Sequence, residues 1–460
     1  MQAEQIVSPD LKTLATDVLA KALKAGATDA EAAVYEGDEF SSLVRLGQVE
    51  TLKESGSRAI GLRVFVGQRT ASTSSSDFSA DSIQRLVDGA IALAKITSED
   101  PFAGLPEAQE FGKVQGDLGL YFEDVNEMPP AERIETARRV EAAAMAYDTR
   151  IQNSGGGDFD TATSHKILVN SHGFTGEYRR SYCGFSASPI AVDEKGGMQR
   201  NYWYSAARTT RKLESPEEIG QEAARRTLAR LGARQVKTQK APVVFSPEIA
   251  RSIIGNIFEA ANGDSIYRNA SFFCDQLGQQ VAGKNITVID DGTMVFDGIG
   301  GFGTSPFDGE GLPTRRTVLV ERGILKNYVL NTYTAKKLGM KSTGNASRGL
   351  AGNPGIGAGN FYLEPGTITP EQLIGDVKAG LYVTEVMGFG VNLVTGDYSQ
   401  GASGMWIENG ELAYPVEEIT IAGNLKDMYK NIVAIGNDLV FRGAVAAPTI
   451  RVEGMMIAGA

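Results

Sequence analysis

The chain has 460 residues, of which 42% are apolar and 22% are charged, values typical of a folded globular protein with more than one core. Its 45 Lys and Arg residues against 56 Asp and Glu residues give a net charge of −11, which disfavours nonspecific binding to nucleic acid or to an anionic membrane. No apolar run approaches the ~20 residues of a membrane helix, and the N-terminal run lacks the pattern of a signal peptide, so we expect a cytoplasmic protein whose two cysteines, Cys183 and Cys274, stay reduced.

The first half of the chain alternates helical and extended patterns. Apolar spacing and capping residues predict helices over residues 9–26, 79–96, 129–148 and 215–231. Strands are expected at 30–36 and 40–46, and again over most of 151–210. The basic, polar stretch 232–240 is typical of a linker. We therefore predict an N-terminal domain over 1–237 and a C-terminal domain over 238–460.

The second half begins with a short strand at 243–245 and a helix that starts at Ser246-Pro247-Glu248. Apolar residues then recur at helical spacing until Gly263, and a strand at 286–289 leads into a glycine-rich loop. The rest is mainly strands, with a hairpin turn at 408–411 and a last helix at 424–434. The predicted class is α+β, with antiparallel sheets, segregated helices and a strand-rich second half.

Several motifs make the chain similar to a known family. They are Asp290-Asp291-Gly292-Thr293, the run FDGEGLPTRRTVLVERG at 307–323, TGNA at 343–346, FYLEPG at 361–366, NLVTGDY at 392–398 and ESGSRAIGLRV at 54–64. Together they resemble the TldD/PmbA family, paired bacterial and archaeal proteins often described as modulators of DNA gyrase. The resemblance spans almost the whole chain and implies the family's fold. The acidic charge gives no support for direct contact with DNA.

The resemblance also bears on zinc. In family members with peptidase activity, the helix that corresponds to 249–263 carries HExxxH, whose two imidazoles bind zinc and whose Glu acts as general base. These positions align here with Ile254, Gly255 and Phe258, which can neither ligate zinc nor move a proton. The cysteine that those members use near the C-terminus is also absent. The resemblance thus implies the PmbA/TldE-like branch, with no cofactor in this chain and zinc only in a TldD-like partner.

The glycine-rich loop and its surroundings hold the remaining candidate residues. Its carboxylates are those of Asp290, Asp291, Asp297, Asp308 and Glu310. They could bind a hard cation through oxygen, although roles in turns and helix caps are favoured. Arg315 and Arg316 are candidate contacts for a partner or a peptide carboxylate, with plain solvation favoured. All of these residues except Asp297 are predicted as possible contacts for a peptide or a partner.

Other catalytic arrangements have weaker signals. His165 and His172, the two histidines of the chain, lie seven residues apart around a predicted strand, a spacing that tends to point them to opposite faces. Ser403 lies in a predicted strand with no helix after it, so it does not form a nucleophile elbow. Neither pattern predicts a catalytic site.

The resemblance implies a heterodimer of TldD and TldE (PmbA) that encloses a cavity, in which TldD cleaves unfolded or short peptides. We predict that this chain is the non-catalytic subunit, which helps to position an extended peptide during proteolysis, in the processing of toxins, antitoxins and peptide antibiotics. Exposed strand edges could accept such a peptide. One alternative is a homodimeric peptide-binding protein without catalysis. Another is a hydrolase that uses the Asp290, Asp291 and Glu310 group.

Overall fold

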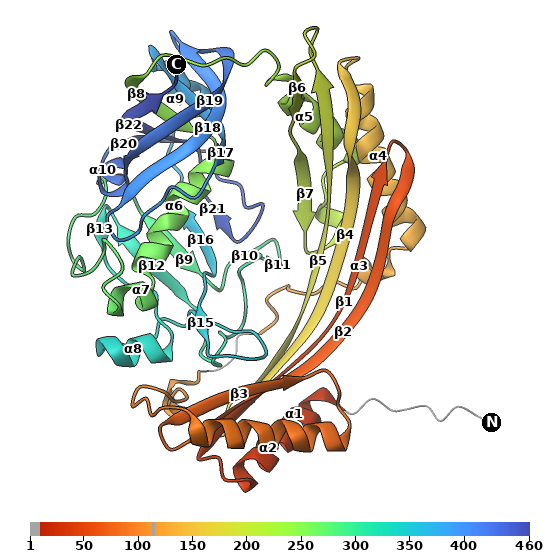
Figure 1. Ribbon diagram of the computed structural model, residues 1–460, viewed down its shortest axis with the longest axis vertical. Helices are drawn as coiled ribbons and strands as arrows, with labels where there is room; N and C mark the ends of the chain where they lie inside the picture. The colour runs from red at the N-terminus through yellow and green to blue at the C-terminus, as the bar shows by residue number, and fades with distance from the viewer. Residues whose placement is uncertain (1–9, 113–115) are drawn as a thin grey trace.

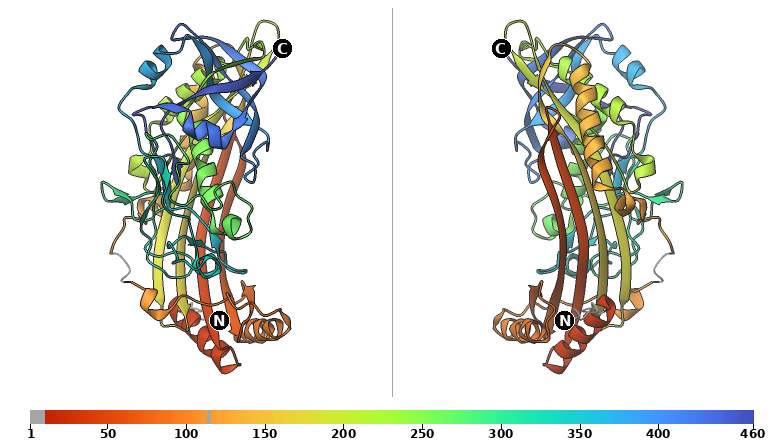
Figure 2. Two further views of the ribbon diagram at one scale, coloured as in Figure 1. Left: turned by 90° about the vertical axis from the view of Figure 1, so that its left-hand side faces the viewer. Right: turned by 90° about the vertical axis from the view of Figure 1, so that its right-hand side faces the viewer.

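One long antiparallel sheet extends along the whole molecule (Figures 1 and 2). The computed structural model describes residues 10–112 and 116–460. The strand order is β3-β2-β1-β4-β5-β6, and β7 also pairs with β5. The strands are β1 (Asp29–Arg45), β2 (Gln48–Val66), β3 (Arg69–Ser75), β4 (Ile151–Asn170), β5 (Thr175–Val192), β6 (Met198–Arg200) and β7 (Trp203–Ala207). Four of them are far longer than the usual ~5–6 residues, so this sheet spans the length of the molecule.

Strand β1 corrects one prediction. Residues 30–36 and 40–46 are predicted to form two separate strands. The structure has one continuous strand, in which Gly37 pairs with Ser57 of β2 and with Ser164 of β4. Ladders on both sides hold the backbone extended through residues that would form a turn in isolation.

Helices cover the sheet on the side away from the C-terminal half (Figure 1). Helices α1 (Leu11–Lys24) and α2 (Ala80–Ile96) pack at one end of the sheet, on Ala30, Ala32 and Val34 of β1. Helices α4 (Pro130–Ala146) and α5 (Pro216–Leu228) cover the other end, and α3 (Asp124–Glu127) is a single turn. Because side chains alternate along a strand, Glu31, Ala33 and Tyr35 point instead toward the C-terminal half.

The C-terminal half lies on the concave side of this sheet and contains two smaller sheets. In the first, the order β19-β18-β17-β8-β22-β20 is joined by a β19–β22 pairing, so five strands form a closed ring. Its strands are β8 (Gln239–Phe245), β17 (Ala379–Met387), β18 (Asp397–Glu408), β19 (Glu411–Asn424), β20 (Ile432–Ile435) and β22 (Ile450–Ala458). The pair β8–β17 is parallel and the other pairs are antiparallel.

The second sheet has the order β13-β12-β9-β16-β21. Its strands are β9 (Val288–Asp291), β12 (Arg316–Glu321), β13 (Ile324–Leu325), β16 (Asn360–Leu363) and β21 (Val445–Ala446). Two short ribbons lie outside this sheet: β10 (Val295–Phe296) pairs with β11 (Ile299–Gly300), and β14 (Ala346–Ser347) pairs with β15 (Gly355–Ile356). The helices are α6 (Pro247–Ala261), α7 (Gly263–Tyr267), α8 (Thr332–Leu338), α9 (Pro370–Gly375) and α10 (Leu425–Lys430). The predicted α+β class is confirmed.

Two predicted helix ends in this half were wrong. Helix α6 ends at Ala261, and the Asn262 side chain then caps a separate helix, α7, by accepting from the Asp264 N–H. The helix expected over 424–434 ends at Lys430, and Ile432–Ile435 forms β20 against β22. Pairing with the β22 edge decided the conformation of this β-branched run.

The two halves form separate sets of strands. In the part of the chain that the structure describes, no named strand up to β7 pairs with one from β8 onward. The domain boundary near residue 238 stays a prediction. None of the helices in the described ranges is long and apolar enough to cross a membrane.

Candidate functional site

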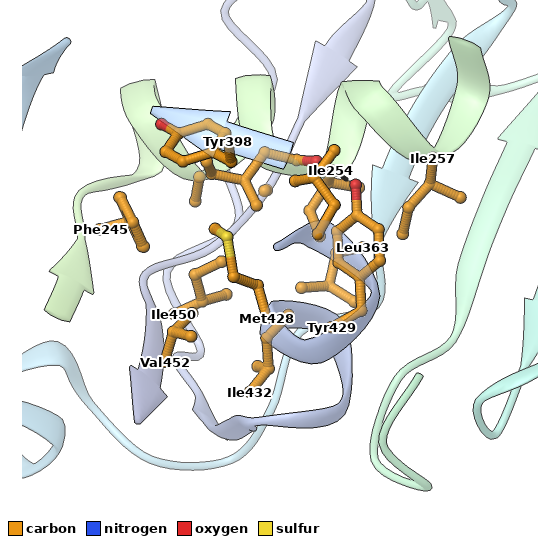
Figure 3. Close-up of a cluster of buried hydrophobic side chains, with 14 of the residues drawn as sticks. Phe245, Ile254, Ile257, Leu363, Tyr398, Met428, Tyr429, Ile432, Ile450 and Val452 are labelled. Atoms are coloured by element: carbon orange, nitrogen blue, oxygen red, sulfur yellow. Dashed lines mark hydrogen bonds between the residues drawn. The ribbon is translucent and has the colours of Figure 1, made fainter. Parts of the chain in front are cut away.

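Helix α6 lies in the largest hydrophobic core of the molecule (Figure 3). Pro247 occupies its first turn, and apolar residues repeat along the buried face. Ile254, aligned with the first His of the zinc motif, is fully buried among side chains that include Tyr398 and Tyr429. The Tyr429 hydroxyl donates to the Ile253 carbonyl at 3.1 Å, which ties α10 to α6.

The two His residues of HExxxH are five positions apart, so when Ile254 takes the first position the second falls on Glu259, one residue after the predicted Phe258. Phe258 and Gly255 have different surroundings. Phe258 is 5% exposed, and its ring meets that of Phe361 edge-on at 5.3 Å between centroids. Gly255 lies on the half-buried side of α6, with open space where a Cβ would stand. Zinc needs nitrogen, sulfur or carboxylate ligands. Ile254 and Gly255 offer none, so Glu259 is the one carboxylate at the three motif positions. Among the described residues, no group of three or more His, Cys, Asp or Glu side chains is placed to hold a metal. The residues present therefore do not fit a zinc ion.

Two of the candidate carboxylates anchor the loop at 345–346. Asp290 accepts from the Asn345 side chain at 2.6 Å and from the Gly359 N–H at 2.7 Å. Asp308 accepts from the N–H groups of Glu310, Leu312 and Ala346 at 2.9–3.0 Å. Burial raises the pKa of Asp290 to about 6 and that of Asp308 to about 7. Both carboxylates thus already bind backbone groups and hold the loop in place.

Glu310 belongs to a buried group of charges between the two halves. It accepts from the Thr332 N–H at 2.8 Å at the start of α8. Burial raises its pKa, and the positive charge of Arg63 opposes that rise. Arg63 on β2 places Nε 2.5 Å from Glu31 Oε1 on β1, and Arg348 places Nη1 2.5 Å from the same oxygen. Strands of the first half and a loop of the second half therefore meet through charged side chains.

The remaining candidates lie apart from this group. Asp291 accepts from the backbone and hydroxyl of Thr293, as in an Asx turn. Arg315 and Arg316 are both exposed, and Arg316 Nη2 lies 3.7 Å from Glu364. Asp297, also exposed, lies 3.7 Å from Lys212. The structure thus places Asp290 and Asp308 where they hold the loop at 345–346, and Glu310 in the buried group of charges. Asp291 is half-buried, and Asp297, Arg315 and Arg316 are exposed.

The histidines and cysteines serve separate local contacts. His165 contacts Glu177 at 3.0 Å, whereas His172 contacts Asp29 at 3.0 Å and the Pro106 carbonyl at 2.7 Å. Cys183 and Cys274 are free thiols, and burial raises the pKa of Cys183 to about 12.

A cavity of about 510 Å³ lies beside Arg348, between the large sheet and the glycine-rich loops. One wall is the concave face of β1, β4 and β5, and the other comes from residues 302–309, 346–350 and 357–358. Aromatic rings form part of it, since Phe307 packs against Phe174 and Tyr178 at 5.0 and 5.2 Å. Its charged lining residues are Lys166, Arg180, Asp308 and Arg348.

Sequence reasoning missed Glu31, Arg63, Lys166, Arg180 and Arg348. A usable signal was present, since Glu31 is a lone acid within the apolar run Ala30–Val34 and Arg63 is a lone base within Ile60–Val66. A single charge inside a buried strand usually has a partner of opposite sign. Arg348 lies in a glycine-rich loop and carried no comparable signal.

Models of three successive domains of one family match the chain. The PmbA/TldA metallopeptidase domain 1 matches residues 30–94, the central domain matches 123–231 and the C-terminal domain matches 238–459. The chain belongs to the PmbA/TldD metallopeptidase family. The resemblance inferred from its motifs is confirmed.

Relatives and solved structures agree with this assignment. The chain is 40% identical to Metalloprotease PmbA of Escherichia coli O157:H7 over 95% of this chain and 94% of that protein. It is 37% identical to a PmbA homologue of Haemophilus influenzae over the same shares. A crystal structure from Bacteroides thetaiotaomicron, described as a modulator of DNA gyrase, has a TM-score of 0.91 at 27% identity, covering 99% of this chain and all of that one. TldE from Thermococcus kodakarensis, at 21% identity and a TM-score of 0.85 over 97% of this chain and all of that one, shares the fold.

Proposed function

We propose that this chain is a non-catalytic, PmbA/TldE-type subunit of a cytoplasmic peptidase complex. In this proposal a TldD-like partner binds the zinc and cuts unfolded or short peptides, and the present chain completes the substrate chamber. The physiological substrates that we propose are toxins, antitoxins and peptide antibiotics. Its relatives carry the name metalloprotease, which describes those proteins.

One observation carries the proposal. In a chain of a metallopeptidase family, the first two positions of the zinc motif hold Ile254, which packs in the core, and Gly255, and residues 243–263 contain no histidine. A catalytic zinc site needs protein ligands that face an open position for water and substrate. Apolar side chains in a closed core supply neither.

An exposed apolar loop supports association with a partner. Between β17 and β18, Phe389 is fully exposed and Val394 is more than half exposed, as is Met387 at the end of β17. Large exposed apolar groups that cluster on one loop mark interaction surfaces more often than isolated ones do. We propose that this loop contacts the TldD-like subunit, or a second copy of this chain if the protein forms a homodimer.

The carboxylate-based hydrolase is less well supported. Asp290 accepts from the Asn345 side chain and the Gly359 N–H, Asp291 accepts from the N–H and hydroxyl of Thr293, and Glu310 accepts one N–H at the start of α8. A general base must be free to reach a substrate proton. These contacts favour a role in holding loops for all three residues.

The test is to purify the chain alone, the TldD-like subunit alone and their mixture. Zinc content and cleavage of an unfolded peptide are then measured in each sample. We expect no stoichiometric zinc in this chain alone, and full cleavage only in the mixture. A variant of this chain with Phe389→Ser should lower cleavage by the mixture, because it weakens association, and should leave the melting temperature of the isolated chain unchanged.

The control variant is Tyr147→Ser, which removes an exposed aromatic residue on the helix-covered side of the long sheet. It should leave cleavage by the mixture unchanged. Zinc at one ion per chain, or cleavage by this chain alone, would contradict the proposal.

A further inference from the structure

The cavity between the two halves has a positively charged lining in a protein whose net charge is −11. Three cationic side chains line it, Lys166 on β4, Arg180 on β5 and Arg348 from the C-terminal half. Asp308 is the acidic side chain of the lining, and its oxygens already accept three backbone N–H groups. The lining therefore carries an excess of positive charge.

Arg348 is the most constrained of these cations. Its side chain is 6% exposed, and its Nη1 shares Glu31 Oε1 with Arg63 Nε. Two buried guanidinium groups thus meet at one carboxylate oxygen. Nη2 of Arg348 and Nη2 of Arg63 are buried and make no hydrogen bond to any described residue, and Glu31 Oε2 beside them is a buried acceptor without a partner among the described residues. Nη1 of Arg348 contacts Glu31 Oε1 without the geometry of a hydrogen bond. Such groups are costly, about 1–3 kcal/mol each and more when charged.

Arg180 has the same feature on the opposite wall. Its Nη2 donates to the Thr304 carbonyl at 2.9 Å, and its guanidinium lies 4.8 Å from the centre of the Tyr178 ring. Its buried Nε has no hydrogen-bond partner among the described residues. Two arginines that line one cavity from different halves of the chain therefore both have free donors.

The position of Lys166 and the aromatic rings define the rest of the site. Tyr35, Lys166 and Tyr178 are register neighbours on β1, β4 and β5, and all three line the cavity. Phe307 adds an apolar wall next to Tyr178. A volume of about 510 Å³ lies within the range of small-molecule sites, ~300–1,000 Å³. It accommodates a ligand with an anionic end and an apolar body.

We infer that this cavity binds a small organic carboxylate, up to the size of a tripeptide, with its carboxylate held between Arg348, Arg180 and Lys166. The three cations supply the charge that a carboxylate needs, and a planar guanidinium can pair with it through two parallel hydrogen bonds. The apolar part of the ligand would lie on Phe307 and Tyr178. This inference concerns the isolated chain and does not depend on the presence of a catalytic partner.

The test is isothermal titration of the full chain with alanyl-alanyl-phenylalanine carrying a free C-terminus. Its C-terminal amide and inorganic phosphate are titrated in parallel. We expect the free acid to bind at least about tenfold more tightly than the amide, since the amide cannot form the charged pair. Equal affinities for acid and amide, or phosphate binding as tightly as the tripeptide, would overturn the inference.

Variants locate the site. Arg348→Lys keeps the charge facing Glu31 but removes the fork, and should weaken binding of the acid by about tenfold. Lys166→Met changes a half-buried residue outside the Glu31 cluster and should also weaken binding, so it decides the outcome if Arg348→Lys fails to fold. Lys195→Met, at an exposed turn after β5, is the control and should bind as the unaltered chain does. Unchanged affinity in folded Arg348→Lys and in Lys166→Met would show that the peptide binds elsewhere.

Discussion

Among single residues, Phe258 and Gly255 differ in their surroundings although both lie in the stretch of α6 that aligns with the zinc motif. Phe258 contacts Phe361 in the core, whereas a Cβ at Gly255 would meet open space. A substitution should therefore have a different effect on stability at each position. This difference gives two matched predictions in one helix.

We expect Phe258→His to lower the free energy of unfolding by about 3 kcal/mol, because it removes buried apolar volume and buries a polar ring. Gly255→Ala should raise it by about 0.5–1 kcal/mol, because alanine is the better helix former and meets no obstacle. Urea denaturation followed by circular dichroism measures both. Equal effects of the two substitutions would mean that Phe258 is not a core residue.

At the scale of elements, the contact between β2 and the loop that carries Arg348 joins the two halves. A Cβ at Gly61 on β2 would overlap the backbone carbonyl of Leu350. The neighbouring pair Arg63 and Glu31 holds Arg348 in the same region. A glycine at position 61 therefore lets the loop lie directly on the sheet.

We expect Gly61→Ala to push residues 346–350 away from the sheet and to lower the free energy of unfolding by about 1–3 kcal/mol. Amide hydrogen exchange should become faster in that loop, while exchange in α1 and α2 stays as before. Gly89→Ala in α2, where a Cβ meets nothing within 4 Å, is the control and should not change exchange in the loop. Unchanged exchange at 346–350 in the Gly61→Ala variant would contradict the close packing.

At the scale of the whole molecule, buried carboxyl groups make stability depend on pH. Burial raises the pKa of Asp158 and of Asp290 to about 6 and that of Asp308 to about 7, against an ordinary value of 3.8. Between pH 4 and 7 the folded state therefore binds more protons than the unfolded chain does. The free energy of unfolding should fall as the pH rises through this range and level off above pH 7.

Asp158→Asn should reduce that slope by up to ~1.4 kcal/mol per pH unit between pH 4 and 6, because it removes one of the three groups. The variant keeps an amide that can still bond to Ser186, the present partner of Asp158. Asp148→Asn is the control, since a hydrogen-bonded pair with Arg150 lowers the pKa of Asp148 to about 2 and places its titration below this window. Urea unfolding at several pH values measures the slopes, and an unchanged slope in Asp158→Asn would contradict the assignment.

The sequence by itself determined the class of fold, the family and the apolar character of α6. Helix caps and apolar spacing placed α2, α4, α5 and α6 to within a few residues, because these signals lie within a few turns of chain. The motifs around 290–323 identified the family. The lack of zinc-binding side chains at Ile254 and Gly255 could also be read from the sequence, because metal binding depends on residue type.

Only the tertiary structure decided how distant segments meet. It joined residues 29–45 into one strand through ladders on both sides, and it ended α10 early through pairing of β20 with β22. It also brought Glu31, Arg63 and Arg348 together across more than 280 residues of sequence. Local propensity does not encode contacts of such range, so the charged cavity could be found only once the two halves were folded against each other.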